Sequence, residues 1–246
     1  MMKNKILFTQ LPALGVHLFT ASGILAGFMA ILAIQEKDWQ AAAVWLFICQ
    51  VVDGVDGTFA RYFNVEKTMP GMDGKVIDQI IDFVTYAVIP ALFFYHSELA
   101  PHTWRLPAAF AMLISAAMYY GKKGMVSEEM HFIGFPVLWN VVVFFLFFVF
   151  RLSPAINTGL IFVFAALHFV PFAYPYPTRA LEYRTITLII SLAALIAAAL
   201  TVWVYPIRNN IFSGILMIAL VYYAFLMWRI NKKIKRSPDG FFPGYS

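Results

Sequence analysis

Two stretches of the sequence decide the fold: VVDGVDGTFAR at residues 51–61 and GKVIDQIID at residues 74–82. Each adjoins an uncharged run, at residues 39–52 and 83–97, and these runs are 14 and 15 residues long. A helix needs roughly 20 residues to cross a bilayer, so neither run is long enough by itself. The runs reach that length only if the helices continue through the carboxylates, over residues 39–61 and 74–96. The sequence therefore predicts two membrane helices that carry aspartates.

The composition of the whole chain agrees with a membrane protein. Of the 246 residues, 61% are hydrophobic and 13% are charged, which is about half the charged share of a soluble domain. This balance excludes an ordinary soluble enzyme, a disordered chain, a coiled coil and a nucleic-acid-binding domain. We expect an all-α, polytopic membrane helical bundle with about eight transmembrane helices, forming one integral membrane domain over residues 1–246.

Charge-free runs predict where these helices lie. The expected spans are residues 16–34, 39–61, 74–96, 106–121, 131–150, 152–178, 185–207 and 209–228. An even number of helices places both termini on one side of the membrane, and that side then holds 14 of the 18 basic residues. Because basic segments are retained in the cytoplasm, we expect both termini and the aspartates to lie on the cytoplasmic side.

Four aspartates gather near the cytoplasmic ends of the two aspartate-bearing helices. Asp53 and Asp56 share a helix face at i and i+3, and Asp78 and Asp82 share one at i and i+4. Each charge inside a membrane costs roughly 2.5–3.5 kcal/mol, so a cation must offset these carboxylates. Oxygen ligands without cysteine or paired histidines suit Mg²⁺ or Mn²⁺, and four carboxylates are enough for two ions. Two metals at a membrane face suit the transfer of a phosphoryl or phosphatidyl group.

Small residues accompany the aspartates. Gly57 and Ala60 lie on the acidic face of the first helix, and Gly74 lies on the acidic face of the second. A nucleotide can lie against the backbone where no large side chain projects, and Arg61 can reach its phosphates. We therefore predict a nucleotide site beside the metals.

The spacing D-x2-D-G-x2-A-R-x12-G-x3-D-x3-D, which starts at Asp53, resembles the signature of the CDP-alcohol phosphotransferases. The twelve-residue gap before Gly74 resembles the branch of that family that contains the bacterial phosphatidylcholine synthases. So do the stretches at residues 17–23, 131–140 and 179–185, and together the resemblance covers nearly the whole chain.

The resemblance implies transfer of a phosphatidyl group from CDP-diacylglycerol to choline, with two Mn²⁺ or Mg²⁺ ions as cofactors and CMP as the second product. It also implies a bacterial inner membrane location with membrane lipids as neighbours, and the sequence is compatible with a homodimer. The implied metal ligands are Asp53, Asp56, Asp78 and Asp82, with Asp82 also taking the proton of the alcohol. The implied CDP-binding residues are Asp56, Gly57, Ala60, Arg61 and Gly74.

Choline adds a physical demand, because its quaternary ammonium cannot donate a hydrogen bond. Such cations are held by aromatic faces with a carboxylate nearby. Tyr86 lies one turn beyond Asp82 on the same helix face. The other candidates flank the loop between the fourth and fifth expected spans: Tyr119, Tyr120, Glu128, Glu129, Phe132 and Trp139.

Two alternatives stay open. The acceptor could be serine, inositol or glycerol 3-phosphate, and a phosphorylated acceptor would use basic residues such as Lys75, Lys122 and Lys123. The aspartates could also form the pathway of a cation transporter. Transporter sites usually lie at the membrane midplane between internal repeats, and no repeat is visible in this sequence. Release of CMP from CDP-diacylglycerol would distinguish an enzyme from a transporter.

Overall fold

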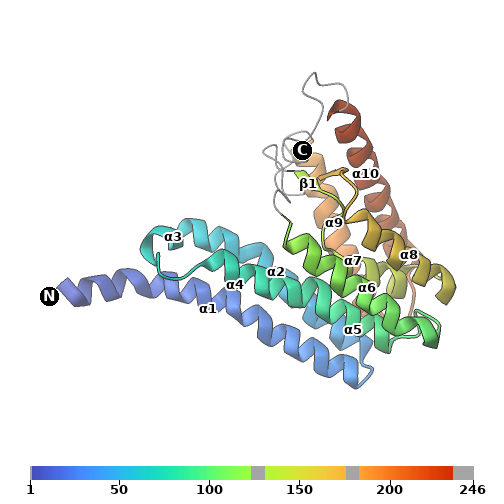
Figure 1. The fold of residues 1–246 in the computed structure, drawn as a ribbon, viewed down its shortest axis with the longest axis horizontal. Helices are drawn as coiled ribbons and strands as arrows, with labels where there is room; N and C mark the ends of the chain where they lie inside the picture. Colours follow the sequence, from blue (N-terminus) through green and yellow to red (C-terminus); the bar gives the residue numbers. More distant parts are fainter. Residues whose placement is uncertain (1, 123–130, 176–182, 235–246) are drawn as a thin grey trace.

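The computed structural model describes residues 2–122, 131–175 and 183–234. Within these ranges the regular secondary structure is helical apart from one pair of short strands (Figure 1). Long apolar helices packed into a bundle confirm the expected polytopic membrane architecture.

The first part of the chain forms the helices that carry the aspartates. In order, they are α1 (Met2–Gln35), α2 (Trp39–Tyr62), α3 (Val65–Thr68), α4 (Gly74–Phe83), the π-helical turn η1 (Val84–Val88), α5 (Ile89–His96) and α6 (His102–Tyr120). The segments α4, η1 and α5 together form one helix over Gly74–His96. Figure 1 shows α1 lying along α2 and α4, so α1 closes one side of the aspartate-bearing pair.

The second part of the chain begins with a strand. Its elements are β1 (His131–Ile133), α7 (Trp139–Phe144), the π-helical turn η2 (Phe145–Val149), α8 (Pro154–Leu167), β2 (Ala173–Pro175), α9 (Arg184–Trp203) and α10 (Asn210–Ile234). The helices α9 and α10 pack against each other as a hairpin (Figure 1). Asn231 of α10 holds β2, because its Nδ2 donates to the Ala173 carbonyl at 2.8 Å and its Oδ1 accepts from the Ala173 N–H at 3.0 Å.

Five helices in the described ranges are long and apolar enough to cross a membrane: Gln10–Gln35, Trp39–Tyr62, Gly74–His96, Arg184–Trp203 and Asn210–Ile234. They coincide with five of the expected spans. The 19-residue helix α6 covers a sixth, at residues 106–121.

The expected spans at residues 131–150 and 152–178 are wrong at one end each, since the helices there cover only Trp139–Val149 and Pro154–Leu167. Within the described parts of the two remainders, His131–Ile133 and Ala173–Pro175 form the antiparallel pair β1–β2, with Phe132 opposite Tyr174. Gly134 adopts a φ of +87°, outside the helical region, and breaks the chain direction directly after β1. An apolar run has the same lack of charge in a strand as in a helix, so counting charges could not separate the two.

A proline explains the π turn inside the Gly74–His96 helix. In a regular α-helix the ring of Pro90 would clash with the carbonyl of Tyr86, and Pro90 has no N–H to donate. In η1 the N–H of Ile89 donates to the carbonyl of Val84, five residues back, which widens the turn before the proline. Tyr86 lies in this widened turn.

Candidate metal and nucleotide site

Three aspartates from α2 and α4 converge between the two helices. One carboxylate oxygen each from Asp53, Asp78 and Asp82 lies within 4.8 Å of the others, and all three residues are half-buried. The helix rise of 1.5 Å per residue places Asp82 about 12 Å along the helix from its start at Gly74. The cluster is therefore recessed between the helices.

The chemistry of this cluster fits a divalent cation. Asp82 Oδ1 is buried and has no hydrogen-bond partner within the part of the chain that the structure describes. Buried polar atoms in proteins are normally paired, and three carboxylates this close repel one another. Oxygen-only ligands at such spacing suit a hard cation such as Mg²⁺ or Mn²⁺. The three aspartates could hold such an ion.

Asp56 takes a different position from the other three aspartates. Its side chain is only 7% exposed and lies beside the hydroxyl of Thr20 on α1. It is not one of the group whose oxygens lie within 4.8 Å, although it is near enough to Asp78 and Asp82 to act on them electrostatically. We expected all four aspartates to lie together. In the structure three of them do, and the fourth, Asp56, lies against α1.

Helix α1 supplies a wall of the site that sequence reasoning missed. The ring of His17 lies against Gly74, because a β-carbon on Gly74 would be 3.0 Å from His17 Cε1. The side chain of His17 is 5% exposed, and its Nε2 has no hydrogen-bond partner among the described residues. The position of His17 three residues before Thr20, on one face of α1, was the available signal.

The small residues of α2 border both Arg61 and α1. A β-carbon on Gly57 would lie 3.4 Å from Nη1 of Arg61, so the glycine leaves space beside the guanidinium. Arg61 is exposed, and its Nη2 donates to the hydroxyl of Thr58 at 3.2 Å. Ala60 instead packs on an apolar cluster that includes Ala13 of α1.

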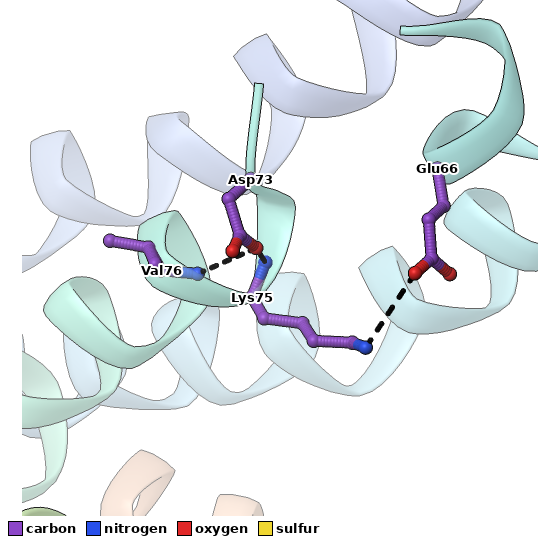
Figure 2. Close-up of polar contacts among 4 residues, drawn as sticks. All are labelled: Glu66, Asp73, Lys75 and Val76. Carbon is purple, nitrogen blue, oxygen red and sulfur yellow. Dashed lines mark hydrogen bonds and ion pairs between the residues drawn. The ribbon is translucent and has the colours of Figure 1, made fainter. Parts of the chain in front are cut away.

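The start of α4 is fixed by a capping aspartate, as Figure 2 shows. Asp73 Oδ1 accepts hydrogen bonds from the backbone N–H groups of Lys75 at 2.9 Å and Val76 at 3.4 Å. The ammonium of Lys75 points toward Glu66 of α3, 3.8 Å away, and both side chains are more than four-fifths exposed at 83% and 89%. Lys75 therefore belongs to the surface.

Tyr86 reaches the aspartate cluster from the inner end. Its hydroxyl donates a hydrogen bond to Asp53 Oδ2 at 2.5 Å. Tyr120 of α6 lies beside the same cluster, and its ring contacts Phe83 at a centroid distance of 6.1 Å. Tyr120 and Phe83 also line an open apolar groove of about 380 Å³ between α4 and α6.

Two other residues expected to hold choline, Tyr119 and Trp139, lie in a second place, around His168. Tyr119 and Trp139 are buried, and their rings pack against His168 at centroid distances of 5.4 Å and 5.2 Å. Phe132 belongs to β1. Glu128 and Glu129 lie outside the residues that the structure describes.

Comparisons with known proteins match this chain over most of its length. The family model for CDP-alcohol phosphatidyltransferase matches residues 16–231. The phosphatidylcholine synthase of Pseudomonas aeruginosa is 34% identical over 218 residues, covering 88% of this chain and 91% of its own. The phosphatidylcholine synthases of Rhizobium meliloti and Mesorhizobium japonicum are 36% and 37% identical, covering 75% and 77% of this chain and 76% and 70% of their own.

Proposed function

Because the chain belongs to the CDP-alcohol phosphatidyltransferase family, we propose that it transfers the phosphatidyl group of CDP-diacylglycerol to choline, giving phosphatidylcholine and CMP. The observation that carries this proposal is the convergence of Asp53, Asp78 and Asp82 at the positions of the family signature. A charged cluster of this kind inside a membrane protein has a functional role by default.

The proposed roles follow from the positions that these residues hold in the family signature. Asp53, Asp56, Asp78 and Asp82 would hold two Mn²⁺ or Mg²⁺ ions. When bound, these ions would supply positive charge that polarises the phosphate and stabilises the charge that develops on it. The CDP group would lie along Asp56, Gly57, Ala60, Arg61 and Gly74, with the guanidinium of Arg61 reaching toward its phosphates.

Asp82 is proposed as the general base. Its Oδ1 is buried and has no protein partner among the described residues, so it can accept a proton. The oxygen of choline forms a bond to the β-phosphorus as the bond from that phosphorus to the CMP oxygen breaks. The hydroxyl proton of choline passes to the Asp82 carboxylate, and CMP leaves with the electron pair of the broken bond.

The surroundings of Lys75 and Lys122 support an acceptor without a phosphate. Lys75 is paired with Glu66 at the surface, and the ammonium of Lys122 donates to the backbone carbonyl of Ile133 at 3.2 Å. A phosphorylated alcohol would need cations that face the aspartates. For the choline ammonium, we propose the ring of Tyr86 together with Tyr119, Glu128, Glu129 and Trp139 as the set to test.

The protein is a membrane protein, and its proposed setting is the bacterial inner membrane with both termini and the aspartate site in the cytoplasm. The distribution of the 18 basic residues supports this orientation. Cysteine-accessibility labelling at the two termini in right-side-out and inverted vesicles would test it. A homodimer is proposed as the assembly to test, by cross-linking in native membranes.

The experiment that tests the function supplies the purified protein with CDP-diacylglycerol and Mn²⁺, and with choline, serine, inositol or glycerol 3-phosphate separately. We expect phosphatidylcholine and an equal amount of CMP, with choline as the productive acceptor. A different lipid product would reassign the alcohol. Failure to release CMP with every acceptor would refute phosphatidyl transfer.

A further inference from the structure

The hydroxyl of Tyr86 has a partner that the binding of choline does not require. It donates to Asp53 Oδ2 at 2.5 Å, which is the short distance typical of an O–H bound to a charged oxygen. Asp53 is one of the three residues whose oxygens lie within 4.8 Å of one another. If Tyr86 only bound choline, it would use the face of its ring, and its hydroxyl would have no function.

The two residues meet at the inner end of the cluster. Tyr86 follows Asp82 by four residues, so it lies about 6 Å deeper along the helix, and Asp53 lies about 4.5 Å deeper than Asp56 on the antiparallel α2. Tyr86 thus contacts the innermost aspartate of α2 from the side opposite the cytoplasmic surface. It is half-buried, and the side chain of Thr85 before it is buried next to α1, where a β-carbon on Gly27 would lie 3.7 Å from Thr85 Cγ2.

The backbone around Tyr86 departs from a regular α-helix. The π turn Val84–Val88 contains Tyr86 and is followed by Ile89 and Pro90. Such turns are rare, are found often at functional sites, and change the direction of the side chains that they carry. The helix therefore departs from regular α-helical geometry at Tyr86, the residue that contacts Asp53.

We infer that Tyr86 is a positioning residue for the metal site: its hydroxyl fixes the Asp53 carboxylate in one rotamer, so that the oxygen not bound to Tyr86 is directed at the cation. This inference rests on the metal site of the proposed function. Partners that hydrogen-bond metal-binding carboxylates orient these ligands, and their loss weakens metal affinity by roughly 10- to 100-fold.

The decisive measurement is Mn²⁺ binding to the full-length protein in detergent or nanodiscs, followed by the electron paramagnetic resonance signal of free Mn²⁺. Tyr86→Phe removes only the hydroxyl and should raise the Kd for Mn²⁺ by roughly 10- to 100-fold. Tyr223→Phe is the matched control, because Tyr223 makes a similar bond of 2.6 Å to Ser191 between α9 and α10. Its Kd should stay within about twofold of the wild-type value, the scatter of a repeated titration, since no metal ligand is touched.

A second measurement works in native membranes and does not need purified protein. The Mn²⁺ concentration for half-maximal phosphatidylcholine synthesis should rise by the same roughly 10- to 100-fold in Tyr86→Phe, and the rate should return toward wild type at saturating Mn²⁺. A KM for choline that is unchanged at saturating Mn²⁺ would separate the hydroxyl from any role of the ring.

The inference is overturned if Tyr86→Phe binds Mn²⁺ as tightly as wild type, or if the wild-type protein binds no Mn²⁺. It is also overturned if Tyr223→Phe weakens Mn²⁺ binding equally, which would point to general destabilisation. Weakened Mn²⁺ binding in Tyr86→Phe together with no lipid product from choline would keep the inference and refute the proposed function.

Discussion

His17 and Gly74 lie in direct contact, because a β-carbon on the glycine would come within 3.0 Å of His17 Cε1. This distance is shorter than an ordinary contact, so Gly74→Ala forces the imidazole to move. Overpacking of this kind costs about 1–3 kcal/mol, and we expect kcat/KM for CDP-diacylglycerol to fall by roughly tenfold. The measurement is steady-state kinetics on Gly74→Ala and on the double variant with His17→Ala. Recovery in the double variant supports the contact as the cause, whereas an unaffected Gly74→Ala would mean that His17 yields freely.

The aspartate cluster gives the strongest expected effect. Asp53→Asn keeps the size of the side chain but removes its charge, and we expect activity to fall by at least about a hundredfold, the scale of a single catalytic group. Asp38→Asn is the control, since Asp38 is exposed and caps α2 by accepting from the Ala41 N–H at 2.9 Å. Near-normal turnover of Asp53→Asn would exclude this residue as a metal ligand.

The space beside Arg61 can be tested with a pair of glycines on α2. Gly57→Leu should abolish CDP-diacylglycerol binding, because the new side chain fills the space next to the guanidinium, 3.4 Å from the β-carbon position. Gly54→Leu should bind normally, since nothing lies within 4 Å of its β-carbon position and the residue is exposed. Binding would be measured by calorimetry with folded protein. Equal affinities for the two variants would remove Gly57 from the nucleotide site.

The choline site is tested by varying choline at saturating CDP-diacylglycerol and Mn²⁺. If the ring of Tyr86 holds the ammonium, Tyr86→Leu should raise the KM for choline by roughly thirtyfold, since a desolvated cation–π contact is worth about 2 kcal/mol. Tyr86→Phe keeps the ring and should change this KM little. Glu128→Gln and Glu129→Gln should also raise it. If none of these variants alters the KM, the ammonium binds elsewhere.

The features that could be predicted from the sequence are those set by the type and spacing of residues along a single helix. Asp53, Asp78 and Asp82 were placed together from helical periodicity and the antiparallel course of two helices, and the structure brings them within 4.8 Å. Asp56 was placed on the same face but turns toward Thr20 of α1, because a three-residue step is 60° away from a full turn.

The parts that could not be predicted depend on contacts between segments distant in sequence. His17 borders Gly74 only because α1 lies along α4, and the shared face of His17 and Thr20 on α1 does not reveal which helix that face packs against. The pairing of Phe132 with Tyr174 was hidden for the same reason, since an isolated apolar tripeptide does not reveal its partner. The hydrogen bond from Tyr86 to Asp53 could not be predicted either, because it depends on how the two helices are placed relative to each other.

The π turn before Pro90 has a consequence for how this helix can change during evolution. A π turn holds one residue more than the α-helical path would need, so deletion of one residue from Val84–Val88 would return this stretch to α-helical length. The direction in which Ile89–His96 faces relative to Asp78 and Asp82 would change little, because the π turn and the shorter α-helical path rotate the chain by nearly the same angle. The ring of Pro90 would then meet the carbonyl four residues before it, so the deletion should be tolerated where the proline is also replaced. Single-residue gaps between homologous chains should therefore fall at this turn together with loss of the proline.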